Sequence, residues 1–329
     1  MKEGKNTDVT IQDVAKAAQV SSATVSRVLN NSASVTSRTA EKVNAVMRAL
    51  GYRPNIIARG LRMSSTKTVG VIISNVLNPF FSRIVRGIED AMAPAGYNVI
   101  ICNTDEDGEK EVNYIKNLID RRVDGLIIAG SGYVMDYADL LGNTPAVFID
   151  RVPNEEEAKQ FDSVTVDNEL GAYLLTKQFL QTGKNHIGMI ASDVITTGMD
   201  RINGFKRAFT EERDSQDGAL LKLTDYLGQN TYELAVSLIE EGVDAIFAGN
   251  NIILLSVLAA VKDQDRAEDI TIGAFDQIDW MRFVDTPLVV VRQPVAEIAK
   301  ESAIILLGRM NQSNDPIQQI VLPIEVVQE

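Results

Sequence analysis

The chain has 329 residues, with 32 Lys and Arg against 45 Asp and Glu, and its formal net charge is −13. One Cys and one His, Cys102 and His186, are too few for a metal cluster and make a nucleophilic triad improbable. The sequence starts Met-Lys-Glu-Gly-Lys, without the apolar core of a secretory signal. Together with the lone thiol, this start predicts a cytoplasmic protein without a membrane partner.

The charge is divided unevenly along the chain. Residues 1–62 hold ten Lys and Arg against four Asp and Glu, a net charge of +6, so the remaining residues carry −19. A basic segment is drawn to phosphates because binding releases counterions, whereas an acidic body is kept off the duplex. We therefore expect a DNA-binding head over residues 1–62 and a separate acidic body over residues 63–329.

Three short helices are predicted in the head. Thr10 is a good N-cap for the first, Ser21 can cap the second, and Thr36 or Ser37 caps a third that ends at Gly51. The apolar residues that recur with helical spacing on the inner faces are Ile11, Val14, Ala15, Ala18, Val25, Val28, Leu29, Val43, Val46, Met47 and Leu50. Two helices with a tight junction at residues 19–20, followed by a third, are typical of a helix-turn-helix that reads the major groove.

The outward face of the second helix is the predicted reader of base edges. Arg27 is the leading candidate for a bidentate contact to guanine, whereas Ser22 and Ala23 offer small contacts that set the preferred bases. The predicted DNA contacts of the head are Thr10, Ser21, Ser22, Ala23, Thr24, Ser26, Arg27 and Asn30. Since one head reads one half-site, a homodimer is expected to read a pseudo-palindromic operator.

Three motifs resemble the head, hinge and first strand of the lac/gal repressor family. They are Ala-Thr-Val-Ser-Arg-Val-Leu-Asn at residues 23–30, Tyr-Arg-Pro-Asn at residues 52–55, and Thr68-Val-Gly-Val-Ile-Ile-Ser-Asn-Val-Leu-Asn-Pro-Phe-Phe81. The resemblance covers essentially the whole chain. It implies a hinge helix at about residues 55–62 that forms on the operator, where Leu61 wedges into the minor groove beside Arg62.

The composition of the hinge agrees with that implication. Pro54 disfavours helix in the residue before it, and the following residues up to Arg62 are too few to stay helical alone. The hinge is therefore expected to order only on DNA, where a bend and a second hinge helix must offset the cost of unstacking a base step. The DNA contacts implied for the hinge are Asn55, Ala58, Leu61 and Arg62.

Beyond Lys67 the sequence alternates short β-branched runs with helical stretches, as in parallel sheets covered on both faces. The expected strands are Val69–Ser74, Asn98–Cys102, Asp124–Ala129, Ala146–Ile149, Ile187–Ala191, Ala245–Gly249, Ile270–Phe275, Val289–Arg292 and Ile320–Val326, and the expected helices include Phe80–Ala95, Glu109–Arg121 and Val295–Met310. The fold class is thus α/β, with the helix-turn-helix head and hinge before a two-lobed body like that of periplasmic binding proteins. The resemblance implies lobes of residues 67–166 plus 294–318 and of residues 167–293 plus 319–329.

Polar side chains follow several of these strands, where ligands bind in a cleft at the carboxyl ends. Arg201 is expected to begin a helix that runs to Phe209. The resemblance implies effector contacts from Phe80, Phe81, Asp150, Arg151, Thr197, Arg201, Phe247, Asn250 and Asp276. Arg151 either joins Arg201 in binding an anionic ligand or points to solvent, and Asn251 either contacts the ligand or caps the next helix.

These features predict a repressor of carbohydrate-utilisation genes whose operator binding is controlled by a sugar, sugar acid or sugar phosphate. The alternative is a global catabolite regulator gated by a phosphoprotein corepressor. A sugar-binding transport protein would have no use for the basic head, and an enzyme would need a general base and a cofactor cradle. Gly130-Ser-Gly132 lacks the third glycine and the helix start of such a cradle, so we expect no catalytic activity, no cofactor and no metal.

Overall fold

A computed structural model of the protein describes residues 9–29, 34–52, 65–132, 135–153, 158–193, 195–225 and 228–328. The chain divides into two compact units, Met1–Thr66 and Lys67–Glu329. Each unit has its own core and is described by itself.

The first unit contains α1 (Ile11–Ala18), α2 (Ser22–Leu29) and α3 (Ser37–Leu50). Thr10 and Asp13 cap α1 reciprocally, Ser21 accepts from the Thr24 amide in α2, and Thr36 caps α3, so the hydroxyl caps expected from the sequence are confirmed. Gly51 ends α3 with a φ of 66°, in the left-handed region that favours glycine. The three helices enclose one small core, whose buried residues are Val14, Ala15, Ala18, Val25, Val28 and Val43.

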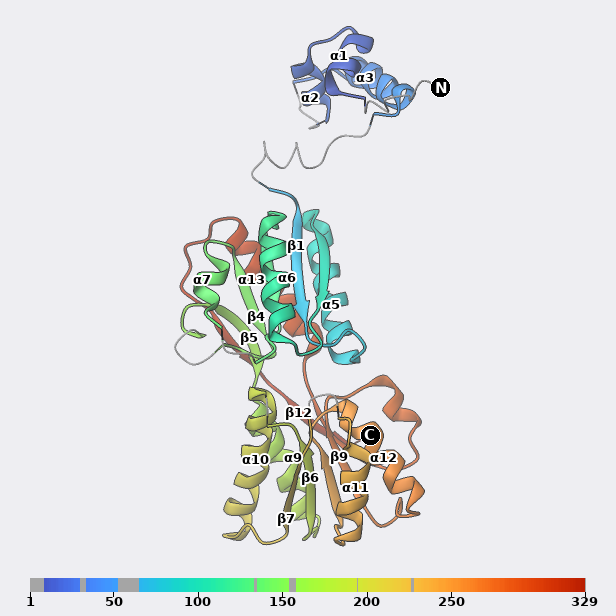
Figure 1. The fold of residues 1–329 in the computed structure, drawn as a ribbon, viewed down its shortest axis with the longest axis vertical. Coiled ribbons are helices and arrows are strands. Elements are labelled where there is room, and N and C mark those ends of the chain that lie inside the picture. Colours follow the sequence, from blue (N-terminus) through green and yellow to red (C-terminus); the bar gives the residue numbers. More distant parts are fainter. Residues whose placement is uncertain are drawn as a thin grey trace. The chain divides into compact units, whose positions relative to one another are not determined.

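The second unit is built on two six-stranded sheets, one in each lobe (Figure 1). In spatial order, the sheet of the first lobe consists of β11 (Gln319–Leu322), β5 (Asp162–Val166), β4 (Ala146–Ile149), β3 (Gly125–Ile128), β1 (Thr68–Ile73) and β2 (Asn98–Asn103), all parallel. One face packs on α5 (Pro79–Met92) and α13 (Val295–Met310), and the other on α6 (Gly108–Asp120) and α7 (Tyr137–Leu141). The short helix η1 (Ala93–Ala95) follows α5 directly.

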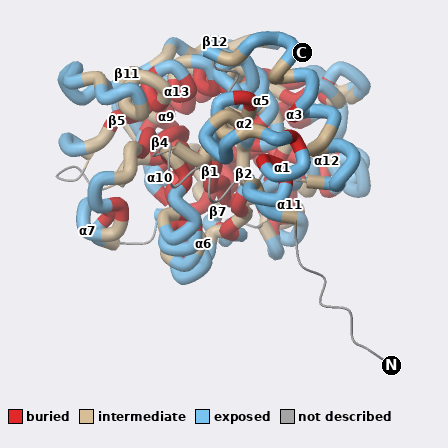
Figure 2. The backbone as a smooth tube through the Cα atoms, turned by 90° about the horizontal axis from the view of Figure 1, so that it is seen from above, coloured by how far each residue is buried: buried red, intermediate tan, exposed pale blue. Residues whose placement is uncertain are grey.

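The sheet of the second lobe consists of β12 (Glu325–Gln328), β10 (Leu288–Arg292), β9 (Thr271–Phe275), β8 (Ala245–Ala248), β6 (Ile187–Ala191) and β7 (Ala219–Leu223). Only β12 is antiparallel to its neighbour in this sheet. One face packs on α11 (Thr231–Glu240), α12 (Asn251–Asp263) and η2 (Asp279–Phe283), and the other on α9 (Asn168–Gln181) and α10 (Thr196–Arg213). Figure 2 shows the buried residues gathered inside a pale blue, exposed outer layer of helices.

The chain passes between the lobes three times within the described residues: from β5 to α9, from β10 to α13 and from β11 to β12. The prediction of a single strand over Ile320–Val326 is wrong. Pro323 has no amide hydrogen to donate, so β11 ends before it in the first sheet and β12 begins after it in the second. The lobe boundary predicted between residues 318 and 319 therefore falls after Leu322.

Among the described helices, none combines the length and apolar character needed to cross a membrane. Within the same residues, His, Cys, Asp and Glu form no group of three or more that could hold a metal ion. Cys102 is buried at 8% exposure with a free thiol, and burial raises its pKa.

Candidate functional site

The helix α2 presents its polar face to solvent, as the sequence predicts. Ser22, Ala23 and Arg27 are exposed, Ser26 is half-buried, and Val25 and Val28 are buried against the rest of the head. Among the other predicted DNA contacts, Ser21 and Thr24 use their hydroxyls in the cap of α2, and the Thr10 hydroxyl donates to Asp13 Oδ2 at 2.7 Å. Asn30, Asn55, Ala58, Leu61 and Arg62, with the hinge helix, lie outside the described residues.

A pocket lined by residues of both lobes lies between them in the body. Eight of the nine predicted effector contacts line it: Phe80, Phe81, Asp150, Arg151, Thr197, Arg201, Asn250 and Asp276. The ninth, Phe247, is fully buried in the core between β8 and the helices α9 and α10, so its predicted place in the pocket is wrong. The rings of Phe80 and Phe81 pack edge to face, with centroids 5.0 Å apart, and form the aromatic wall.

Each lobe contributes one buried carboxylate to the pocket. Asp150 follows β4 and Asp276 follows β9, both with left-handed backbones of φ 62° and 74°. Burial raises the pKa of Asp150 to about 6, although Arg151 and Arg201 oppose the shift. Burial also raises the pKa of Asp276, against the effects of Arg201 and of Gln293, which donates to its Oδ1 at 2.5 Å.

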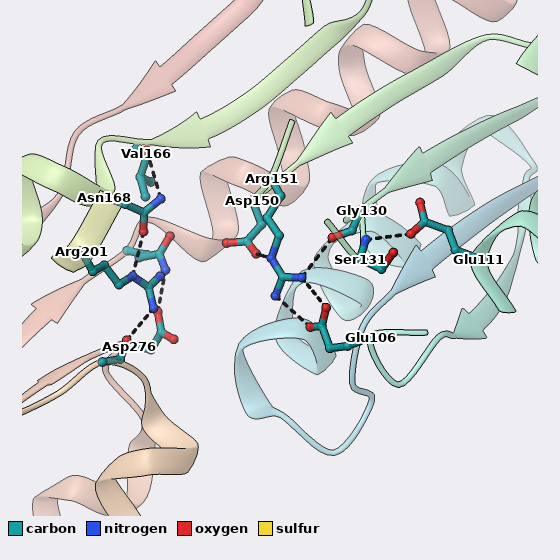
Figure 3. Close-up of polar contacts among 12 residues, drawn as sticks. Glu106, Glu111, Gly130, Ser131, Asp150, Arg151, Val166, Asn168, Arg201 and Asp276 are labelled. Carbon is teal, nitrogen blue, oxygen red and sulfur yellow. Dashed lines mark hydrogen bonds and ion pairs between the residues drawn. The ribbon is translucent and has the colours of Figure 1, made fainter. Parts of the chain in front are cut away.

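Arg201 is held rigidly at the back of the pocket. Its Nε donates to Asn168 Oδ1 at 2.9 Å (Figure 3), and its Nη1 donates to the Gly249 carbonyl at 2.7 Å. Its guanidinium lies 3.7 Å from the centre of the Phe275 ring. The prediction that Arg201 begins its helix is wrong, because α10 begins at Thr196. Ile195 at the N-cap makes no side-chain cap hydrogen bond, so the sequence carries no start signal there.

Arg151 lines the pocket and extends to Glu106, as Figure 3 shows. Its Nη1 and Nη2 donate to Glu106 at 2.6 and 2.9 Å, and Nη1 also donates to the Gly130 carbonyl at 3.0 Å. Its Nε lies 3.3 Å from Asp150 Oδ2. Only 3% of the side chain is exposed, so the alternative that Arg151 points to solvent is wrong. Sequence reasoning missed Glu106, although it follows β2 in the loop that leads to α6.

Asn250 and Asn251 have different roles from those expected. Asn250 Oδ1 accepts from the amides of residues 252 and 253 and so caps α12. The alternative in which Asn251 caps this helix is therefore wrong. Its Nδ2 instead donates to Asn78 Oδ1 at 2.7 Å, which joins the two lobes across the pocket. Asn78, which caps α5, was not singled out by the sequence analysis.

The described units thus combine a helix-turn-helix with a two-lobed body that has a pocket between its lobes. This combination defines a ligand-responsive DNA-binding regulator. The model for lacI-family bacterial regulatory proteins matches residues 10–55, and that for a periplasmic binding protein domain matches residues 69–282. The chain belongs to the lacI family of transcriptional repressors, which are not enzymes.

Relatives and solved structures match over nearly the whole chain. The transcriptional repressor PurR of Haemophilus influenzae is 32% identical over 94% of both proteins, and catabolite control protein A of Priestia megaterium is 32% identical over 96% of this chain and 97% of its own. The lac repressor dimer, bound to operator and an anti-inducer, is 25% identical with a TM-score of 0.84 over 98% of both chains. The regulator CelR in complex with cellobiose is 25% identical with a TM-score of 0.72, over 98% of this chain and 99% of its own.

Proposed function

We propose that this repressor controls carbohydrate-utilisation genes in the cytoplasm, as a homodimer whose grip on a pseudo-palindromic operator depends on a polyhydroxylated ligand between the lobes. The observation that carries the proposal is the pocket itself. Asp150 from one lobe and Asp276 from the other face a common space in which Arg201 and two aromatic rings also lie. Carboxylates and a guanidinium bind adjacent hydroxyl groups, while aromatic rings cover the apolar face of a sugar.

The comparisons support this proposal in two respects. One similar structure is a dimer on its operator and another holds cellobiose, which agree with a dimeric reader of two half-sites and with a sugar-type ligand. In the proposed mechanism, Arg27, Ser22 and Ala23 read base edges, and the hinge residues up to Arg62 contact the minor groove. Ligand contacts that differ between open and closed lobes then change the affinity for operator.

The relative catabolite control protein A favours a second candidate, a global regulator gated by a phosphoprotein corepressor. The two candidates differ in what changes operator affinity. A small molecule is sufficient in the first, whereas the second also needs a phosphorylated protein.

An operator titration with the full-length protein tests the proposal. Fluorescence anisotropy is measured on DNA from upstream of its own gene and of neighbouring sugar genes, with and without a panel of sugars. Nanomolar, salt-sensitive binding that one sugar shifts at least tenfold is the expected result. Binding that responds only to a phosphoprotein would favour the second candidate, and no binding would overturn both.

A further inference from the structure

The buried charges around the ligand pocket do not cancel. Two of the described residues that line it are cations, Arg151 and Arg201, and each already has polar partners in the structure. Three buried or nearly buried carboxylates face them: Asp150, Asp276 and Glu106. The formal charge of this group of five is therefore −1.

Glu106 has a defined geometry in this group. It lies in the loop before α6 with a left-handed φ of 61°, directly before Asp107, which caps α6 through the amides of residues 109 and 110. Its side chain is 11% exposed, and both of its oxygens accept from the Arg151 guanidinium. A planar, bidentate pair of this kind fixes both partners.

The loop after β3 fixes the same guanidinium from its other side. The carbonyl of Gly130 accepts from Arg151, and the next residue, Ser131, donates its amide to the buried Glu111 at 2.7 Å. Glu111 also accepts from the Tyr137 hydroxyl. An anionic ligand could use Arg151 only by displacing Glu106, which would leave a carboxylate without its partner in a largely buried place.

We infer that Glu106 determines the ligand specificity of the pocket: by neutralising Arg151, it makes the pocket select neutral polyhydroxylated ligands and reject sugar acids and sugar phosphates. The inference rests on the proposed function of the pocket as the effector site. Asp150 from one lobe and Asp276 from the other then accept hydrogen bonds from hydroxyl groups of the ligand. The excess of negative charge in this group is also felt by Asp150, because the charges of Asp276 and Glu106 add to the effect of burial in raising its pKa.

Calorimetric titration of the full-length protein tests this inference with matched ligands. D-glucose, D-galactose, D-ribose and D-xylose are each compared with their aldonic acid and terminal phosphate. The wild type should bind one neutral sugar at least tenfold more tightly than its anionic counterparts. Glu106→Gln, which keeps the side-chain shape and frees the Arg151 charge, should raise affinity for the anionic counterparts about tenfold or more.

Two control variants complete the experiment. Glu109→Gln removes the same charge from an exposed position at the start of α6, and should leave the selectivity unchanged. The double variant Glu106→Gln/Arg151→Gln should lose the anion binding that the single variant gains. If Glu106→Gln fails to fold, the wild-type panel still tests the inference, because a preference for an anionic ligand would overturn it.

The outcomes separate this inference from the proposed function. A wild type that prefers an acid or phosphate, or a Glu106→Gln variant with unchanged selectivity, would overturn the role of Glu106 while the pocket stays the effector site. No binding of any sugar, acid or phosphate would overturn both.

Discussion

At the residue scale, Asp150 is a buried carboxylate whose charged form the fold disfavours. Its pKa of about 6 lies above its ordinary value of 3.8, so the folded protein holds this proton more tightly than the unfolded chain. The charged form of Asp150 lowers the free energy of unfolding. This loss of stability is absent below about pH 4, grows between about pH 4 and 6, and reaches its full size above about pH 6. At one pKa unit per 1.4 kcal/mol, it reaches roughly 3 kcal/mol.

Replacing Asp150 by Asn removes this pH dependence and imitates the protonated carboxyl. We expect Asp150→Asn to melt at a higher temperature than the wild type at pH 7, and the difference to shrink toward zero as the pH falls to 4. Thermal melting across this pH range measures it. A difference between the two proteins that stays constant with pH would show that the charge of Asp150 does not carry the effect.

Arg27 is the residue with the clearest predicted role in sequence recognition. It is exposed on α2, where a guanidinium can reach the edge of a guanine. Arg27→Ala should cost about 1–3 kcal/mol of operator binding and relax the preference at one base pair. Arg38→Ala, an equal loss of charge on the exposed surface of α3, is the control. Equal losses on operator and random DNA would instead assign Arg27 to a phosphate.

At the element scale, the packing of α9 against α10 depends on Gly204. A Cβ there would lie 2.1 Å from the Glu169 carbonyl oxygen and 2.8 Å from the Tyr173 amide nitrogen, both backbone atoms of α9. The two helices would have to separate, and this movement would disturb the element that carries Arg201. Helix propensity alone would favour alanine by about 1 kcal/mol. The sign of the change in unfolding free energy therefore shows whether the steric clash or the helix propensity dominates.

Gly204→Ala is expected to destabilise the body by about 3 kcal/mol or more, because overpacking moves backbone rather than a flexible side chain. Gly308→Ala in α13 is the matched control, since the only neighbour that its Cβ would meet is Ser313 Cβ at 3.9 Å. This control should be neutral or slightly stabilising. Denaturant unfolding of the three proteins measures the difference, and equal stabilities would contradict the close approach.

Strong local patterns predicted most of these elements from the sequence. Ala146–Ile149, Ile187–Ala191 and Val295–Met310 are confirmed with their predicted bounds. The strands β5 and β7 were missed, because β5 contains Asp162, Ser163 and Thr165 and β7 is only partly buried. Local spacing placed polar side chains at strand ends, and the resemblance to the lac/gal repressor family assigned them to the pocket. Neither identified Glu106 or Asn78, whose partners lie 45 and 173 residues away.

At the scale of the whole molecule, Asn78 and Arg83 are among the described residues of the first lobe that bridge to the second. Asn78 pairs with Asn251 in a buried place, and Arg83 pairs with Asp279 at 2.5 Å while donating to the Gln277 carbonyl at 3.2 Å. The second pair is largely exposed on its acidic side and is worth little by itself. The buried amide pair therefore contributes more to holding the lobes together.

Asn251→Asp tests this contribution with an almost isosteric change. The amide that donates to Asn78 Oδ1 becomes an oxygen, so two acceptors would face each other in a buried place, at a cost of about 1–3 kcal/mol. The closed arrangement should lose population, which would enlarge the radius of gyration of the isolated body in small-angle scattering. It should also weaken ligand binding about tenfold, since part of the binding energy must then close the lobes.

Asn113→Asp adds the same charge at an exposed position of α6 and should change neither measurement. If both variants behave alike, the pair between Asn78 and Asn251 does not set the balance between open and closed lobes.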